Sequence, residues 1–334
     1  MSHQHHDPHV AGEEVGADRV AQLLAPPGRK VLVTTHRKPD GDAAGSMIGL
    51  TRILEGLGHD VVMWHVEGPG LPDDLAWLLG PDEAVVGGPV ADHEERLVVS
   101  VDAATSHRMT DDDPSALGGP IINIDHHHDN PMWGHYNFVD GGASSSAEMV
   151  VRVADALGAE ITREVALPLY VGLVTDTGRF SYGSTGAQAH AVAARLIDAG
   201  VDPAAVFRRV YEGVPFGDVR LVGRALAGAR SELEGRLIIA VITDDDVTEA
   251  GGQNSDGVVE ALRAVAGAEV AAVIRQVQGA WRVSVRASGD TVDVSAIAAL
   301  EGGGGHRAAA GFTSQRDPDA IIALIRDAVV AQDG

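Results

Sequence analysis

Strand and helix signals alternate through the first two hundred residues, and this alternation limits the fold more than any other feature of the sequence. Short apolar runs rich in β-branched residues, typical of buried strands, occupy 30–35, 60–66, 97–102, 121–125 and 171–175. Helical spacing of apolar residues occupies 43–57, 145–157, 163–170 and 187–199. Strands that alternate with helices predict a parallel sheet with helices on both faces. Such a sheet binds its ligands beyond the carboxyl ends of its strands.

The pattern changes near residue 201 and then restarts on a smaller scale. A connecting helix is predicted over 203–232, with a break near 213–215, followed by strands at 237–243, 269–276 and 281–287 and helices at 258–266, 292–300 and 318–332. The sequence therefore predicts an α/β protein in four parts: a disordered tail (1–17), a larger parallel-sheet domain (18–200), a linker helix (201–232) and a smaller α/β domain (233–334). The histidines of the tail have no rigid frame, so we expect them to be solvated.

Composition and charge narrow the possible functions. The chain has no cysteine, which excludes disulfides, thiolate metal sites and cysteine nucleophiles. Its 48 acidic and 25 basic residues give a net charge of −23, a field that repels long duplex nucleic acid. A small anionic substrate is compatible with this field if bound cations reverse the local sign. Because no apolar run reaches the roughly 18 residues that cross a bilayer, and no signal peptide is recognisable, we expect a cytoplasmic protein without a membrane partner.

Acidic residues and histidines follow the predicted strands. They form the segment HRKPDGD at 36–42, the single Asp102, the segment DHH at 125–127 and the single Asp176. The strand ends of a parallel sheet gather at one edge, so we expect these groups to converge, and like charges that converge resist ionisation unless cations neutralise them. Histidine and carboxylate ligands without sulfur suit Mn²⁺, with Mg²⁺, Fe²⁺, Co²⁺ and Zn²⁺ as alternatives. Two such ions about 3.5–4 Å apart can activate water for attack on phosphorus.

Each of these segments also has a purely structural interpretation. Asp42 suits the cap of the helix predicted from residue 43, Asp176 suits the cap of a turn, and Asp102 can be an ordinary acid at a strand end. The segment 125–127 can be a surface turn. Ser145 or Ser144 suits the cap of the helix predicted from residue 145, with Glu148 at the capping-box position, and we expect this structural role rather than a catalytic one.

The motifs taken together resemble those of a known family. In their order along the chain, HRKPDGD, the strand-end Asp102, IDHHH, VTDTGRF and GGGGHRAAAGF resemble the DHH phosphoesterases that carry a C-terminal DHHA1 domain. The resemblance extends from about residue 31 to residue 312 and is strongest to short two-domain members. Those are nano-RNases that also act as 3′-phosphoadenosine-5′-phosphate phosphatases, and stand-alone cyclic di-AMP phosphodiesterases. It further implies a homodimer.

The resemblance implies a role for each motif of the first domain. Two Mn²⁺ ions per chain, with Mg²⁺ or Co²⁺ as alternatives, would be held by His36 and Asp40, by Asp42, His126 and Asp176, and by Asp102, which both ions share. Asp125 would orient a histidine, as metal-bound imidazoles require. His127 would face the scissile phosphate and assist the leaving group or stabilise its charge. A buried histidine satisfied by a backbone carbonyl is the structural alternative for His127.

In the second domain the resemblance implies a substrate clamp. A glycine-rich turn can present backbone N–H groups to a phosphate. The implied substrate ligands are Arg286, Ser284, His306, Gly303, Gly304 and Gly305. This chain has Ala287 where many family members have a serine, so one substrate hydrogen bond is absent or comes from elsewhere. Arg108 and Arg179 are further candidate substrate contacts.

These inferences predict a Mn²⁺-dependent phosphohydrolase for short oligoribonucleotides, pApA, 3′-phosphoadenosine 5′-phosphate and cyclic di-AMP. A nucleotide-sensing module without catalysis is an alternative, but it predicts a missing ligand, and none is missing. A single-strand exonuclease would need a basic channel, for which the charge gives no support. A pyrophosphatase of the same superfamily would lack the GGGGH segment. A dinucleotide-binding dehydrogenase is disfavoured because no GxGxxG follows the first strand.

Overall fold

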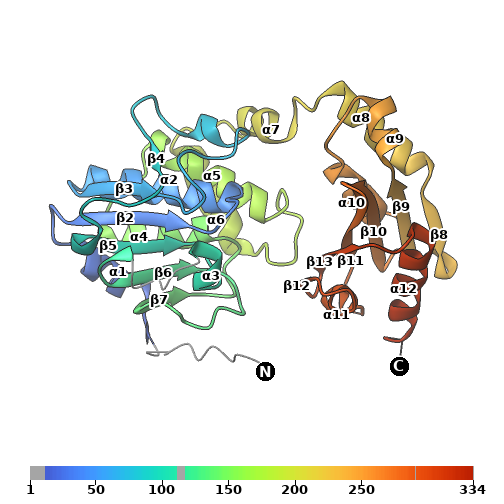
Figure 1. Ribbon diagram of the computed structural model, residues 1–334. Helices are drawn as coiled ribbons and strands as arrows, with labels where there is room; N and C mark the ends of the chain where they lie inside the picture. The colour runs from blue at the N-terminus through green and yellow to red at the C-terminus, as the bar shows by residue number, and fades with distance from the viewer. Residues whose placement is uncertain (1–11, 111–116, 290, 334) are drawn as a thin grey trace. The chain divides into compact units, whose positions relative to one another are not determined.

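The chain forms two compact units, Met1–Glu212 and Gly213–Gly334 (Figure 1). The computed structural model describes residues 12–110, 117–289 and 291–333, with only the backbone of Asp256 and His306. The predicted α/β class is confirmed, because the first unit holds a parallel sheet and the second unit a smaller sheet. Within the described ranges, no helix combines the length and the apolar character needed to cross a bilayer.

Seven parallel strands form the sheet of the first unit, in the order β1-β7-β6-β5-β2-β3-β4. Their bounds are β1 (Glu13–Glu14), β2 (Lys30–Thr35), β3 (Asp60–Trp64), β4 (Val85–Val86), β5 (Leu97–Val101), β6 (Ile121–Asp125) and β7 (Tyr136–Val139). From β2 the chain continues outward to β3 and β4, and then returns to build β5, β6 and β7 on the other side of β2. The strand order therefore reverses between β2 and β5, which is where open parallel sheets bind ligands.

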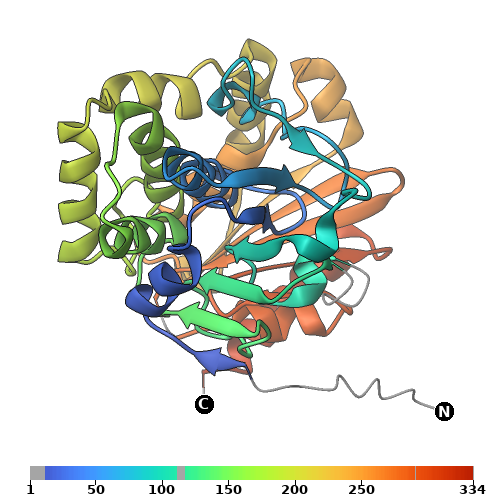
Figure 2. The same cartoon turned by 90° about the vertical axis from the view of Figure 1, so that its left-hand side faces the viewer.

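Long helices cover one face of this sheet, as Figure 2 shows. The helices of the first unit are α1 (Ala17–Leu24), α2 (Gly41–Gly56), α3 (Ser106–Met109), α4 (Ser146–Leu157), α5 (Arg163–Asp176), α6 (Ala187–Asp198) and α7 (Pro203–Tyr211). On the other face, Leu32 and Val98 pack against Trp64 and against partly buried side chains of irregular segments, such as Val90 and Trp133. The sequence predicted helices on both faces of this sheet. Instead, irregular connecting segments cover the second face.

Helices α2 and α5 pack closely through glycines. A Cβ atom at Gly45 would lie 2.2 Å from the carbonyl oxygen of Pro168, and one at Gly49 would lie 2.5 Å from the side chain of Leu169. This close antiparallel contact brings the start of α2 beside the end of α5. The prediction of a strand at 171–175 is wrong, because these residues continue α5. The helix is buried on nearly every side, so its apolar run lacks the periodicity that distinguishes a helix from a strand.

Two other segments differ from the expected organisation. The described end of the predicted tail is structured, since β1 pairs with β7 and α1 begins at Ala17. Residues 1–11, with their histidines, lie outside the described residues. The break predicted near 213–215 is present, since α7 ends at Tyr211 and α8 (Phe216–Ala227) begins beyond it, and the boundary between the units falls in this break. Residues 230–232, which the prediction included in the helix, form a strand.

The second unit is a six-stranded sheet in the order β12-β13-β11-β10-β9-β8, in which β9 and β10 pair in parallel and the other neighbours pair antiparallel. Its strands are β8 (Arg230–Glu232), β9 (Leu237–Ile242), β10 (Val270–Val277), β11 (Ala280–Ala287), β12 (Gly304–His306) and β13 (Ala309–Ser314). Helices α8, α9 (Asp244–Ala250) and α10 (Asp256–Arg263) share one apolar cluster with β9 and β10. Helices α11 (Val294–Ala299) and α12 (Pro318–Val330) pack on the opposite face.

Candidate active site

The predicted metal ligands of the first unit lie where its strand order reverses. His36 and Asp102 directly follow β2 and β5, the strands on either side of the reversal, and His126 follows β6. Asp102 has a backbone φ of 58°, in the left-handed region that few residues other than glycine occupy. Backbone strain of this kind concentrates at functional sites. The fold therefore maintains an unfavourable backbone conformation at Asp102. This residue lies at the centre of the carboxylate cluster, which consists of His36, Asp40, Asp42, Asp102, His126 and Asp176.

The segment 36–42 supplies two carboxylates that differ in their surroundings. Asp40 caps α2, and its Oδ1 accepts hydrogen bonds from the N–H groups of Asp42 at 3.0 Å and Ala43 at 3.1 Å. The sequence predicted Asp42 as this cap. Instead, Asp42 lies in the first turn of α2, is 1% exposed and points into the protein. The capping bonds leave Oδ2 of Asp40 at 3.9 Å from Nε2 of His36.

His36, Asp40 and Asp102 form a first set of candidate metal ligands, with three ligand atoms within 4.8 Å of one another. Nδ1 of His36 donates to the carbonyl oxygen of Arg37 at 2.6 Å. Its Nε2 is buried, lies 3.4 Å from Oδ2 of Asp102 and has no hydrogen-bond partner in the described part of the chain. A buried polar atom rarely lacks a partner. A cation at this position would provide one, so these residues fit a metal ion.

Asp42, His126 and Asp176 form a second set within the same distance. Nε2 of His126 lies 3.4 Å from Oδ2 of Asp176, 4.0 Å from Oδ2 of Asp42 and 3.5 Å from Oδ1 of Asp102. Asp176 ends a helix rather than a strand, and it reaches the cluster because α5 packs along α2. A third set consists of Asp102, His126 and His127. The two oxygens of Asp102 thus face different histidines, Oδ2 toward His36 and Oδ1 toward His126.

Burial and mutual repulsion oppose full ionisation of this cluster. Burial raises the pKa of Asp42 well above its ordinary value, and the charges of Asp102 and Asp176 raise it further. Burial also raises the pKa of Asp176 to about 6. Burial lowers the pKa of His126, but the hydrogen bond to Asp102 and the nearby carboxylates outweigh burial and raise it to about 10. The raised pKa values mean that these side chains hold protons in the absence of cations, and divalent cations would displace those protons. The oxygen and imidazole donors of the cluster suit Mn²⁺ or a similar ion.

His127 is oriented by a buried carboxylate. Its Nδ1 donates to Oδ1 of Asp125 at 2.7 Å, and Oδ2 of Asp125 accepts from Nδ2 of Asn130 at 2.6 Å. Asp125 is completely buried, so this arrangement is rigid. Nε2 of His127 lies 3.4 Å from Nη1 of Arg108, a residue that the sequence indicated only as a further candidate. The histidine that Asp125 orients is therefore His127.

The N-terminus of α4 contacts two of the carboxylates, which the sequence did not predict. Ser145 caps the helix, as predicted, but the carboxylate of Glu148 accepts from the N–H and the hydroxyl of Ser144 instead of closing the predicted capping box. The N–H groups of Ser146 and Ala147 donate to Oδ2 and Oδ1 of Asp42 at 2.6 and 2.9 Å, and Oγ of Ser146 donates to Oδ1 of Asp102 at 3.0 Å. Ser146 and Asp42 are 104 residues apart in sequence, so no local motif could have indicated this contact.

We predict that Ser146→Ala weakens Mn²⁺ binding about 10-fold, because a hydroxyl that orients a ligating carboxylate contributes to metal affinity. Isothermal titration of the EDTA-treated protein measures the affinity without turnover. The matched control is Ser145→Ala, which should lower the free energy of unfolding by about 1 kcal/mol and leave the Mn²⁺ affinity unchanged. Equal losses of affinity in the two variants would show that the hydroxyl of Ser146 does not position Asp102.

Three of the six predicted substrate residues of the second unit line a cavity of about 440 Å³ on β11, β12 and β13. Arg286 and Ser284 line it from β11, and Gly304 lines it from β12. Arg282, which the sequence did not single out, also lines this cavity. His306 belongs to β12, but its side chain lies outside the described part of the structure.

The glycine run differs from the predicted phosphate-binding turn. The N–H groups of Gly302 and Gly303 bond to carbonyl oxygens of α11, and Gly304 begins the edge strand β12. A Cβ atom at Gly303 or Gly305 would lie 2.3 or 2.4 Å from a carbonyl oxygen of β13. These two glycines are therefore required by the close approach of the strands. Of the three predicted glycine ligands, only Gly304 has open space beside it.

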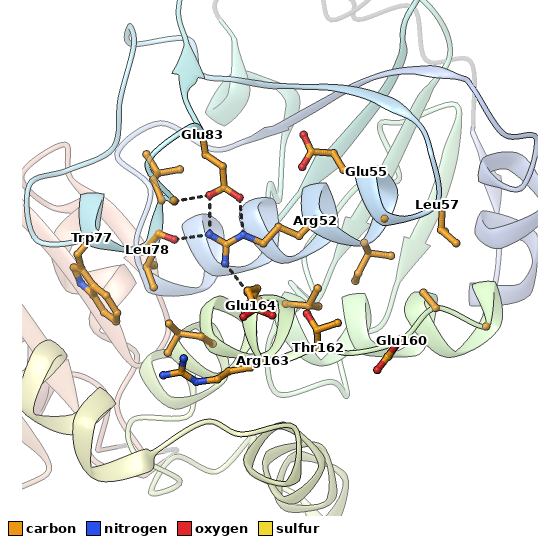
Figure 3. Close-up of a pocket in the computed structure, with 18 residues that line it drawn as sticks. Arg52, Glu55, Leu57, Trp77, Leu78, Glu83, Glu160, Thr162, Arg163 and Glu164 are labelled. Atoms are coloured by element: carbon orange, nitrogen blue, oxygen red, sulfur yellow. Dashed lines mark hydrogen bonds and ion pairs between the residues drawn. The ribbon is translucent and has the colours of Figure 1, made fainter.

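A larger cavity, of about 840 Å³, lies at the other end of α2 and α5 (Figure 3). The C-terminal half of α2 lines it, and the 16 residues of α2 span about 24 Å, so it is distant from the carboxylate cluster. Arg52 donates to both carboxylate oxygens of Glu83 at 2.7 Å and to the carbonyl oxygens of Leu78 and Glu164. Pro168 has no N–H for the Glu164 carbonyl, so Arg52 replaces that helical hydrogen bond. Arg52 therefore has a structural role here.

Comparison with known proteins identifies relatives along most of the chain. The DHH family N-terminal domain matches residues 30–173, and the DHHA1 domain matches residues 234–331. The bifunctional oligoribonuclease and PAP phosphatase NrnA of Thermus thermophilus is 35% identical over 299 residues, which cover 88% of this chain and 87% of that protein. The protein of the same name from Bacillus subtilis is 28% identical over 301 residues, which cover 88% and 92%.

Solved structures share the fold. An exopolyphosphatase-related protein from Bacteroides fragilis superposes with a TM-score of 0.85 at 23% identity, over 94% of this chain and 96% of that one. The exonuclease RecJ bound to manganese superposes with a TM-score of 0.53 at 17% identity, over 97% and 96%. The matched domains, together with a relative that is 35% identical over most of its length, show that this chain belongs to the DHH family and carries a DHHA1 domain.

Proposed function

We propose that this protein is a metal-dependent phosphohydrolase that cleaves short oligoribonucleotides, cleaves linear dinucleotides such as pApA to AMP, and dephosphorylates 3′-phosphoadenosine 5′-phosphate. The observation that carries the proposal is the convergence of two sets of candidate metal ligands on Asp102 where the strand order reverses. The names of the NrnA relatives give oligoribonuclease and PAP phosphatase activities for those proteins. Cyclic di-AMP is a further candidate substrate.

The metal that we propose is Mn²⁺, two ions per chain, with Mg²⁺ or Co²⁺ as alternatives. The mixed carboxylate and imidazole donors support this choice, and the related RecJ structure is of a protein bound to manganese. Ions held there would polarise a phosphoryl oxygen and lower the pKa of an attacking water. The first set would be His36, Asp40 and Asp102, and the second would be Asp42, His126 and Asp176, with Asp102 shared.

Groups next to the cluster suit a substrate phosphate. Arg108 and His127 lie 3.4 Å apart. Burial lowers the pKa of His127, but its bond to Asp125 and the charge of Asp102 outweigh burial and raise it. Arg108 and the protonated form of His127 would attract a phosphoryl oxygen, and His127 would then protonate the leaving oxygen. In the second unit, Arg286 would bind another phosphate of the substrate, since guanidinium groups bind phosphate through paired hydrogen bonds.

A chromatographic product assay tests this function. The protein is incubated with pApA, 3′-phosphoadenosine 5′-phosphate, cyclic di-AMP, a long single-stranded RNA and pyrophosphate, each with Mn²⁺ or with EDTA. We expect Mn²⁺-dependent release of AMP from pApA and from 3′-phosphoadenosine 5′-phosphate, and little action on the long RNA, because the net charge of −23 repels long polyanions.

The other outcomes identify the alternatives. Cleavage of pyrophosphate alone would indicate a pyrophosphatase, and rapid degradation of the long RNA would indicate an exonuclease. Binding of nucleotides without turnover would indicate a sensing module. Light scattering of the same preparation tests the homodimer that the family resemblance implies.

A further inference from the structure

Three side chains of β11 share a sheet face that the neighbouring helices leave partly uncovered. Arg282, Ser284 and Arg286 alternate along the strand and therefore point to the same side. Their partners on β10 include Val273, which belongs to the apolar cluster beneath α8, α9 and α10. That cluster contains residues of β9 and β10 but none of β11 or β13. Consequently Arg282 is exposed and Arg286 is half-buried on this face.

Arg282 faces a second arginine across the sheet. Arg275 of β10 is its direct partner in the antiparallel ladder, and like charges at paired positions destabilise a sheet. Arg275 donates to Oγ of Ser255 at 3.2 Å, a neutral group, and its buried Nε has no hydrogen-bond partner among the side chains that the structure describes. Among the described residues, no carboxylate forms an ion pair with either arginine. The chain has 48 acidic residues, yet none of those described neutralises Arg275 or Arg282. The stability of the sheet therefore does not explain why these two arginines are paired.

The floor beside these arginines is made of small residues. The positions on β13 that pair with 282, 284 and 286 hold Thr313, Gly311 and Ala309. Gly304 of β12 pairs with Gly311 and adds no side chain. The cavity of about 440 Å³ lies over this floor and is lined by both Arg282 and Arg286. A ligand on this face would therefore meet guanidinium groups above a surface without bulky side chains.

We propose that Arg282, with Arg275 opposite it, forms a second phosphate subsite, which binds a backbone phosphate of a short single-stranded oligoribonucleotide while Arg286 binds another. This inference rests on the proposed function. Arg282 and Arg286 are four residues apart, about 13 Å along the strand, so the two guanidinium groups suit separate phosphates of one chain. The subsite would strengthen binding of oligonucleotides and contribute little to binding of a mononucleotide.

Isothermal titration in EDTA tests the subsite without turnover, with pApApA and 3′-phosphoadenosine 5′-phosphate as probes. We expect Arg282→Gln to raise the Kd of pApApA about 10-fold, because a charge-assisted contact is lost. The slope of log Kd against log salt concentration should fall by about 0.7, the value for one phosphate contact of a single strand. The Kd of the mononucleotide should change much less. Arg282→Lys should restore the slope but only part of the affinity, because lysine binds phosphate as a point charge.

Arg326→Gln is the matched control, because Arg326 belongs to α12, which packs on the opposite face of the sheet. Equal losses in Arg282→Gln and Arg326→Gln would attribute the effect to net charge and overturn the subsite. If Arg282→Gln weakens the binding of pApApA and of 3′-phosphoadenosine 5′-phosphate equally, Arg282 and Arg286 bind the same phosphate. That result would also overturn the proposed second subsite. If the wild-type protein binds pApApA through Arg282 but does not cleave it with Mn²⁺, the subsite is confirmed and the proposed function is contradicted.

Discussion

Asp102→Asn is expected to lower kcat for pApA by about 10³-fold or more, because Asp102 is the ligand that the two proposed metal ions would share, and its loss would remove several kcal/mol of transition-state stabilisation. One oxygen of Asp102 lies 3.4 Å from Nε2 of His36, and the other lies 3.5 Å from Nε2 of His126. Asparagine preserves the size of the side chain and an oxygen that can accept the hydrogen bond of Ser146. It removes the charge that both candidate ion positions share.

Initial rates across a Mn²⁺ titration, together with isothermal titration of Mn²⁺, measure this effect. We expect at least one Mn²⁺ site to be lost. The control is Asp155→Asn, since Asp155 forms an exposed ion pair with Arg195, and such pairs contribute little to stability. Thermal unfolding of both variants shows whether the fold is intact. Wild-type activity in folded Asp102→Asn at saturating Mn²⁺ would contradict the shared role of Asp102.

The sequence predicted the centre of the first sheet because its strands are continuous β-branched runs. Strands β2, β5 and β6 were predicted within one residue of their observed ends. The convergence of His36, Asp102 and His126 follows from these strands, because parallel strand ends share one edge. Strands β1 and β4 have two residues each, and two residues show no periodicity that a prediction can use.

Tertiary contacts explain what the sequence did not predict. Asp176 was expected at a strand end, whereas it ends α5 and reaches the cluster through the close packing of α2 and α5. The bonds from the start of α4 to Asp42 join segments more than one hundred residues apart, so the serines indicated only a cap. Arg282 was missed because an arginine in a strand is unremarkable until the register places Arg275 opposite it.

His127→Gln is expected to lower kcat for pApA by about 10²–10³-fold, which is the contribution of a positioned general acid. Hydrolysis breaks the bond between phosphorus and a ribose oxygen, and the electron pair of that bond leaves on the oxygen. Ribose alkoxide is strongly basic and needs a proton. Asp125 holds Nδ1 of His127, so the proton would come from Nε2, on the side of Arg108. Glutamine is polar and of similar length but cannot donate a proton as an acid.

A comparison of pApA with bis-p-nitrophenyl phosphate distinguishes proton donation by His127 from its other possible roles. In bis-p-nitrophenyl phosphate the leaving group is a nitrophenolate, which departs without a proton, so its hydrolysis should fall far less in His127→Gln than that of pApA. The matched control is His128→Gln, because His128 is the exposed next residue and lies outside the candidate ligand sets. It should leave both rates close to those of the wild-type protein.

The ratio of the two rates, measured with the Mn²⁺ affinity, decides among the roles of His127. A drop in the ratio with unchanged Mn²⁺ affinity means that His127 supplies the proton to the leaving oxygen. Equal losses on both substrates with unchanged affinity would contradict this and leave His127 to stabilise charge on the phosphoryl group beside Arg108. Loss of Mn²⁺ binding would instead make His127 a metal ligand, as its grouping with Asp102 and His126 allows. Only the first outcome requires the imidazolium form of His127, in which Nδ1–H bonds to Asp125 and Nε2–H supplies the proton.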